Sequence, residues 1–200
     1  MSVNLAKSKI IGLTGGIATG KSTVSSYLIG KGYIVIDSDK IVHHLWVSHQ
    51  LMIKQVKLAF SLNNQQDLRK QVADIVFGDL EKLNQLNQIV HPFVFEEIDK
   101  QLKLYKEEKI IFIDMPLLFE INYQSHCDKT WLVYAPRETQ LNRMLTRDNL
   151  TENEALKRIN AQMSIEEKKN LATKVIDNDG SMKHLYKQID KLLDEEENEE

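Results

Sequence analysis

Residues 15–23 read Gly15-Gly16-Ile17-Ala18-Thr19-Gly20-Lys21-Ser22-Thr23. This run fits the pattern of Gly, four residues and Gly-Lys-Ser, which builds a phosphate-binding loop when it lies between a strand and a helix. The glycines allow turns in which successive N–H groups point inward at a polyphosphate, and the next helix adds the positive end of its dipole. We therefore expect a phosphate cradle formed by Gly15, Gly16, Ala18, Thr19, Gly20, Lys21, Ser22 and Thr23.

Two side chains and the flanking residues complete this prediction. Lys21 is expected to reach the β- and γ-phosphates, and the Ser22 hydroxyl to bind the Mg²⁺ that bridges them. Residues 10–14 form an apolar run typical of a buried parallel strand, and apolar residues recur at helical spacing after Lys21. A glycine-rich turn without a ligand is the alternative, but the order of strand, loop and helix favours a P-loop.

Four further apolar runs are typical of buried strands: residues 33–36, 110–113, 131–134 and 174–177. Together with residues 10–14 they predict an α/β fold, the three-layer P-loop NTPase fold with a parallel five-stranded sheet. At 200 residues, 42% of them hydrophobic, the chain can bury the core of one compact domain.

Composition also limits the partners and the location. The net charge of −3 argues against a nucleic-acid backbone as the main partner, because such a partner favours a basic surface. Cys127 is the lone cysteine, which fits a reducing compartment and a small buried side chain. There is no apolar run of membrane-spanning length and no signal-peptide core, so we expect a cytoplasmic protein without a membrane partner. Nothing in the sequence indicates an obligate protein partner.

Acidic residues follow two of the predicted strands, at the sheet edge where ligands bind in open α/β folds. Asp39, in the run Asp37-Ser38-Asp39, could accept a proton from an attacking hydroxyl or help to order the metal. Alternatively, Asp37 or Asp39 could cap the helix that begins near Lys40. Asp114 resembles a Walker B acid that holds Mg²⁺ directly or through water, again with capping as the alternative. We favour a place near the metal for Asp114.

Residues 41–91 show helical spacing only, which predicts a helical insertion into a core formed by about residues 1–40 and 92–200. Three histidines, His43, His44 and His49, lack the partners and spacing of a zinc site, so we assign no metal to them. His91-Pro92 predicts a break, with a new helix after the proline.

A helical lid is predicted over about residues 143–170. Arg143 and Arg147 lie four residues apart, and guanidinium groups suit the charge of a transferring phosphoryl group, although a solvated helix face is the alternative. Capping boxes at 151–154 and 164–167 predict two short helices. Asn178 could border an adenine, and the acidic run 194–200 is expected to be a frayed, solvated tail.

In their order along the chain, these motifs resemble the dephospho-CoA kinase family. The match spans nearly the whole chain; its elements are residues 11–23, Asp37-Ser38-Asp39, Arg69, His91-Pro92, residues 116–120, Arg143 with Arg147-Asp148, and residues 175–178 with Gly180. Many NTPases share the P-loop, whereas the ordered set is specific. Ala18-Thr19 stands where Gly-Ser is commoner in the family, and Ala18 keeps a small residue there.

The resemblance implies a kinase that uses ATP and Mg²⁺ to phosphorylate the ribose 3′-hydroxyl of dephospho-CoA. By the same resemblance Asp39 is the catalytic base, and Arg69 binds substrate phosphates from the helical insertion. The resemblance further implies catalytic roles for Lys21, Arg143 and Arg147, an ATP contact for Asn178, and substrate contacts for Thr14, His91, Pro116 and Leu117. Two alternatives stay open at this point: a kinase with another small acceptor, and a nucleotide-dependent switch, although no Asn-Lys-x-Asp guanine motif is present.

Overall fold

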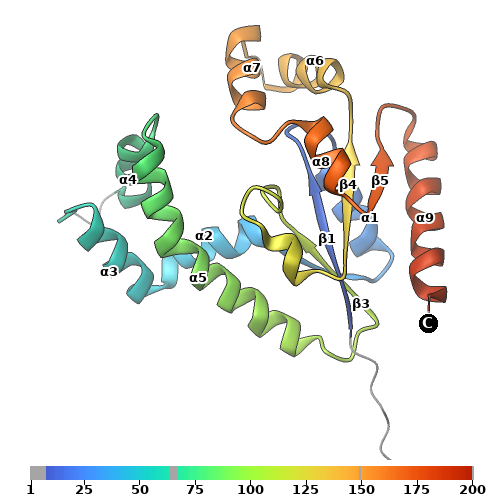
Figure 1. Ribbon diagram of the computed structural model, residues 1–200, viewed down its shortest axis with the longest axis horizontal. Helices are drawn as coiled ribbons and strands as arrows, with labels where there is room; N and C mark the ends of the chain where they lie inside the picture. Colours follow the sequence, from blue (N-terminus) through green and yellow to red (C-terminus); the bar gives the residue numbers. More distant parts are fainter. Residues whose placement is uncertain (1–7, 64–66, 149, 200) are drawn as a thin grey trace, which may run out of the picture. The chain divides into compact units, whose positions relative to one another are not determined.

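The computed structural model describes residues 8–63, 67–148 and 150–199 (Figure 1). The chain divides into two compact units, one formed by Met1–Ile36 with Tyr105–Glu200 and the other by Asp37–Leu104. The second unit therefore ends later than the 41–91 insertion expected from the sequence. Within the described residues, no helix combines the length and apolarity that a membrane span requires.

The first unit is built on a five-stranded sheet with the strand order β2-β3-β1-β4-β5. At its centre β1 (Lys9–Gly15) pairs in parallel with both β3 (Ile110–Asp114) and β4 (Lys129–Tyr134). The edges are β2 (Ile34–Asp37), beside β3, and β5 (Lys174–Asp177), parallel to β4. The α/β fold with a five-stranded parallel sheet that the sequence predicts is confirmed.

The helices of this unit are α1 (Lys21–Gly30), α6 (Arg137–Asp148), α7 (Glu152–Asn160), α8 (Ile165–Leu171) and α9 (Met182–Asn198), with a short 3₁₀ turn at Tyr123–His126. Of these, α1, α8 and α9 pack on the sheet. Apolar faces of α1 and α9 pack on the sheet side by side in one core cluster. The loop after β3 contributes to the sheet's cover, because a Cβ at Gly12 would meet Leu118 and the Cys127 sulfur. Both predicted capping boxes are confirmed, at the starts of α7 and α8.

The second unit is helical, as the spacing predicted: α2 (Ser38–Ser48), α3 (Gln50–Ala59), α4 (Leu68–Val76) and α5 (Leu80–Leu104). The predicted break at His91-Pro92 is wrong, because α5 runs through Pro92. An internal proline costs a helix about 3 kcal/mol. Val90, Val94 and Ile98 form one buried stripe across it, and each such side chain stabilises by about 1.5–3 kcal/mol. Packing on both sides of the proline therefore outweighs its cost.

The predicted frayed tail is also wrong for the described part of residues 194–200, because α9 continues to Asn198. Glu196 is 2% exposed, and its carboxylate receives Lys9 at 3.0 Å and Lys129 at 2.9 Å. These lysines begin the neighbouring strands β1 and β4. Their ammonium groups anchor the acidic end of α9 to the sheet.

We expect Glu196→Gln to lower the free energy of unfolding by roughly 2 kcal/mol, because it removes the charge from two charge-assisted hydrogen bonds. Glu195→Gln is the matched control, since Glu195 lies one residue earlier in α9 and its side chain is 36% exposed. Urea unfolding of both variants measures the difference. An equal loss in the two variants would contradict a specific anchoring role for Glu196.

Candidate active site

The P-loop joins the end of β1 to the start of α1 through a backbone with two left-handed residues. Ala18 has φ 58° and Gly20 has φ 90°. A residue with a side chain is disfavoured at positive φ, so the φ of 58° at Ala18 explains why glycine is favoured at this position. Gly20 is the N-cap residue of α1 and has no side chain that could cap the helix's first N–H groups. Those groups therefore suit an anion.

The loop is held from outside by Asn178 and Arg143. The buried Asn178 amide donates to the carbonyl oxygen of Thr19 at 2.7 Å. Arg143, from α6, donates to the carbonyl oxygens of Ala18 at 3.2 Å and of Asn178 at 2.6 Å. Sequence reasoning placed Asn178 beside an adenine and Arg143 in a lid, and it missed that both brace the phosphate loop.

Gly20 cannot carry a side chain in this arrangement, because an added Cβ would lie 2.1 Å from the Asn178 amide nitrogen. Gly20→Ala is expected to weaken ATP binding by about tenfold or more, since a non-glycine residue strained at positive φ costs about 1–3 kcal/mol and the brace must also shift. Gly32→Ala is the control, with a similar φ of 94° and nothing within 4 Å of its Cβ. Calorimetric titration with ATP compares the two, and equal Kd values would refute the role of the brace.

Lys21, at the start of α1, meets Asp114, at the carboxyl end of β3. The Lys21 ammonium forms an ion pair with one Asp114 carboxylate oxygen, and the Ser25 hydroxyl donates to the other. Asp114 is 5% exposed, so this pairing satisfies a carboxylate that burial would otherwise penalise. It does not cap a helix, which removes the alternative considered from the sequence.

Oxygen donors suited to Mg²⁺ are present at this place, namely the Asp114 carboxylate and the Ser22 hydroxyl at the start of α1. Among the residues that the structure describes, no three His, Cys, Asp or Glu side chains form a metal-binding group. Mg²⁺ at phosphate sites is typically held by one or two protein oxygens together with substrate phosphates and waters. The residues fit such a metal rather than one enclosed by protein ligands.

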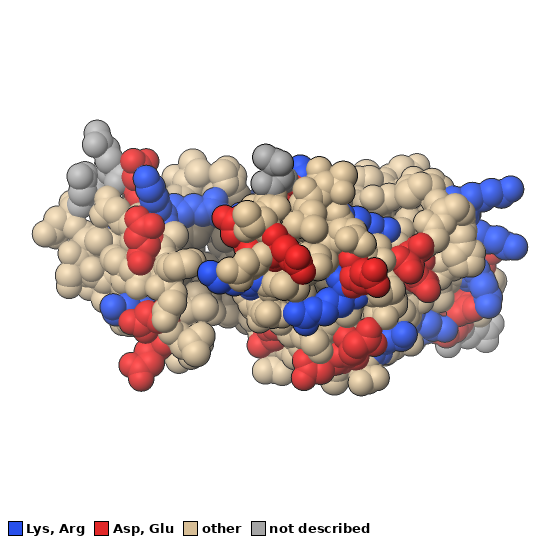
Figure 2. All heavy atoms as spheres, turned by 90° about the horizontal axis from the view of Figure 1, so that it is seen from above, with Lys and Arg blue, Asp and Glu red and all other residues tan. Residues whose placement is uncertain are grey.

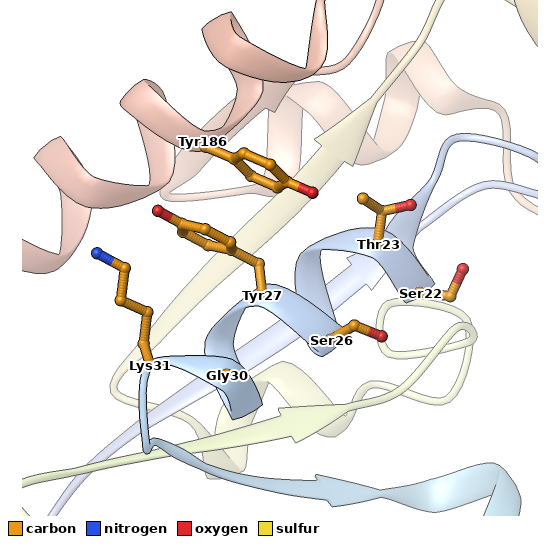
Figure 3. Close-up of a pocket in the computed structure, with 7 residues that line it drawn as sticks. All are labelled: Ser22, Thr23, Ser26, Tyr27, Gly30, Lys31 and Tyr186. Carbon is orange, nitrogen blue, oxygen red and sulfur yellow. The ribbon is translucent and has the colours of Figure 1, made fainter.

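An open groove of about 570 Å³ follows α1 away from the loop, with Ser22 and Thr23 at one end and Lys31 at the other (Figure 3). Along it the Tyr27 ring stacks on Tyr186 of α9, with centroids 4.2 Å apart and 9° between the planes. The Tyr27 hydroxyl also donates to Asp190 at 2.9 Å. These contacts fasten α1 to α9, so the helix that carries Ser22 has fixed neighbours.

The segment between α7 and α8 contacts both the P-loop and the loop after β3. The Gln162 side chain accepts a hydrogen bond from the Ile17 N–H at 3.0 Å. Glu120 accepts one from the Met163 N–H at 3.1 Å. The base of the predicted lid is thus tied to the loop that is expected to hold phosphate.

Other predicted residues have other partners. Arg147 does not join Arg143, because it pairs with its neighbour Asp148, with Nε 2.6 Å from the carboxylate. Thr14 is buried and donates to the Pro116 carbonyl oxygen at 3.1 Å, while Leu117 is 42% exposed. The two arginine positions therefore differ in environment although their spacing suggested one shared face.

The second unit carries Asp39, Arg69 and His91. Asp37, whose side chain accepts from the Lys40 N–H at 3.0 Å, caps α2, whereas Asp39 lies in the first turn with an exposed side chain. Arg69 of α4 lies 3.3 Å from the His43 ring nitrogen. Burial lowers the pKa of His91, whose ring stacks on Phe95. The structure thus assigns the cap to Asp37 and not to Asp39.

Comparison with known proteins gives one family. Residues 9–184 match a family model described as dephospho-CoA kinase. A relative named dephospho-CoA kinase, from Shouchella clausii, is 42% identical over 185 residues, 90% of this chain and 94% of the relative.

Two solved structures are similar over nearly their whole length. The crystal structure of TT1252 from Thermus thermophilus has a TM-score of 0.82 and 34% identity, covering 94% of this chain and 97% of that one. Dephospho-CoA kinase from Campylobacter jejuni has a TM-score of 0.70 and 31% identity, covering 93% and 96%. Sequence and structure comparisons therefore agree over the core and the helical segments alike.

Proposed function

The chain belongs to the dephospho-CoA kinase family, and from this premise we propose that it transfers the γ-phosphoryl group of ATP to the ribose 3′-hydroxyl of dephospho-CoA. The products are CoA and ADP, in the last step of CoA biosynthesis. The observation that carries the proposal is the family match over residues 9–184, which includes the braced P-loop with Lys21. The turns of the loop, its N–H groups at the start of α1 and the positive charge of Lys21 suit a nucleoside triphosphate.

ATP binds along the P-loop, with its phosphates on the N–H groups at the start of α1. When ATP binds, Lys21 leaves Asp114 and contacts the β- and γ-phosphates, where its charge stabilises the transferring group. Ser22 and the released Asp114 would hold Mg²⁺, which supplies further neutralisation of phosphate charge. Arg143 keeps the loop in shape, and Asn178, directly after β5, supports it.

Asp39 is the group that accepts the proton of the ribose hydroxyl. Two observations support this role: Asp37 already serves as the cap of α2, and the Asp39 carboxylate is exposed at the start of that helix. α2 begins directly after β2, and the carboxyl ends of parallel strands share one edge of a sheet, where P-loop ligands bind. A carboxylate is a suitable base once the hydroxyl attacks an electron-poor phosphorus.

The proposal assigns further residues to substrate binding. Arg69, an arginine able to bind phosphate through two donors, serves the pyrophosphate of dephospho-CoA. His91, Pro116 and Leu117 complete the substrate contacts. Thr14, which the sequence resemblance also assigns to the substrate, is fully buried and supports them through its hydrogen bond to the Pro116 carbonyl. Residues 143–170 act as the lid, with Arg147 leaving Asp148 for a phosphate when the lid closes and excludes water.

The test is ATP-dependent formation of CoA by the purified protein with Mg²⁺ and dephospho-CoA, followed by chromatography and mass spectrometry. We expect ADP and CoA in equal amounts. ADP formation with AMP, a nucleoside or shikimate, but not with dephospho-CoA, would indicate a different acceptor. GTP binding without any acceptor would instead indicate a nucleotide-dependent switch.

A further inference from the structure

Lys168 is a lysine with no exposed surface, on a helix that is otherwise largely charged and solvated. Its relative exposure is 0%. It follows Ile165 by three residues, so the two share the inner face of α8. The next residue, Lys169, is exposed, and its ammonium lies 4.3 Å from the centroid of the Tyr134 ring. Two adjacent lysines thus have opposite surroundings.

The buried ammonium holds the loop after β3 in two places. Lys168 Nζ donates to the Pro116 carbonyl oxygen at 2.8 Å and pairs with Glu120 Oε1 at 2.8 Å. The Pro116 carbonyl also accepts from Thr14 at 3.1 Å, and Glu120 also accepts from the Met163 N–H at 3.1 Å. Lys168 therefore ties α8 directly to the loop after β3, at two acceptors that are also bonded by the end of β1 and by the base of the lid.

Fold stability alone is a poor explanation for this lysine. Burial lowers the pKa of Lys168, and the positive charge of Lys21 acts in the same direction, whereas Glu120 opposes both. Well-packed apolar residues often replace a buried ion pair without loss of stability. What an apolar residue could not replace is the hydrogen bond that Lys168 donates to the Pro116 carbonyl. Together with the one from Thr14, it sets the position of this carbonyl and hence of the adjoining, 42% exposed Leu117.

We propose that Lys168 is a positioning residue for the acceptor substrate, fixing the Pro116-Leu117 segment through its carbonyl and through Glu120. This inference rests on the proposed function, in which that segment contacts dephospho-CoA. Lys168 itself touches no substrate. Its loss therefore affects how the acceptor binds more than how the P-loop grips ATP.

The experiment compares Lys168→Met, Lys168→Arg and Lys169→Met in steady-state kinetics with each substrate varied separately, and in calorimetric binding of dephospho-CoA. Loss of hydrogen bonds from a charged donor predicts that Lys168→Met raises KM and Kd for dephospho-CoA by about tenfold or more, with KM for ATP changed by less than about threefold. Lys168→Arg, which keeps the charge and donors, is expected to recover most of the affinity, and Lys169→Met to behave as wild type.

Lys168→Met leaves Glu120 without its cation, so Lys168→Met with Glu120→Gln serves as a second variant that strands no charge. Equal losses for ATP and dephospho-CoA, no loss for either, or failure of both variants to fold would overturn the positioning role. Failure of the proposed function is distinguishable, since the wild-type protein would then form no CoA.

Discussion

Lys21→Ala is expected to lower kcat for CoA formation about a thousandfold or more, because it removes the ammonium that stabilises charge on the transferring phosphoryl group. The measurement is single-turnover transfer from γ-labelled ATP, which separates chemistry from product release. The substitution also removes the cationic partner of Asp114, which is 5% exposed. An unpaired buried carboxylate destabilises the fold, so an activity loss alone would be ambiguous.

Two further variants separate catalysis from folding. Lys21→Ala with Asp114→Asn removes the stranded charge, and we expect it to regain stability in a thermal melt but not activity. Lys31→Met, at the other end of α1, breaks a lysine–aspartate pair of 2.8 Å with Asp190 and is expected to leave kcat unchanged. Recovery of activity together with stability in the double variant would show that Lys21 serves the fold only.

Asp39→Asn is expected to lower kcat by about a hundredfold to ten-thousandfold, the range that general-base catalysis contributes. KM for ATP should change little, because Asp39 is assigned to the acceptor hydroxyl. Stopped-time assays of CoA at saturating substrates measure the effect. The protein should fold normally, since the side chain is exposed and asparagine has nearly the same shape.

Asp37→Asn is the matched control for Asp39, two residues away in the same run. Asparagine caps helices as well as aspartate does, so the hydrogen bond from Lys40 to residue 37 can persist and activity should be retained. If the two variants lose activity to the same extent, the motif matters for the local fold of α2 and the assignment of the base is wrong.

The sheet and the phosphate loop could be predicted because their signals are local. Apolar runs define β1 to β5, and the Gly-Lys-Ser pattern specifies the turns of the loop. The contacts from Asn178 and Arg143 that hold the loop lie outside that pattern. The caps of α7 and α8 also have local signals, because the Ser or Thr and the Glu are three residues apart. Such features need no information about distant segments.

The errors arose where packing between distant segments decided the outcome. Pro92 lies within a helix because buried residues continue on both sides of it, and the acidic end of α9 is ordered because Lys9 and Lys129 meet Glu196. The spacing of nearby residues reveals neither the packing around Pro92 nor the lysines that pair with Glu196. A run of charged residues is usually solvated. Only the folded structure shows that the first residues of β1 and β4 are lysines that lie next to the end of α9.

The site shows the same limit. The spacing of Arg143 and Arg147 predicted similar roles, yet one braces the P-loop and the other pairs with Asp148. The burial of Lys168 could have been suspected from one local feature: it follows Ile165 by three residues and so lies on the inner face of a capped helix. On the face shown in Figure 2, Lys and Arg lie among Asp and Glu, in keeping with a chain of 26 basic and 29 acidic residues.

The most direct measurement is a crystal structure of the protein with Mg²⁺, a non-hydrolysable ATP analogue and dephospho-CoA. We expect that Lys21 has left Asp114 for the β- and γ-phosphates, and that the ribose 3′-oxygen lies in line with the γ-phosphorus and within hydrogen-bond distance of Asp39. A triphosphate bound elsewhere with Lys21 still on Asp114, or a 3′-oxygen remote from Asp39, would contradict this expectation.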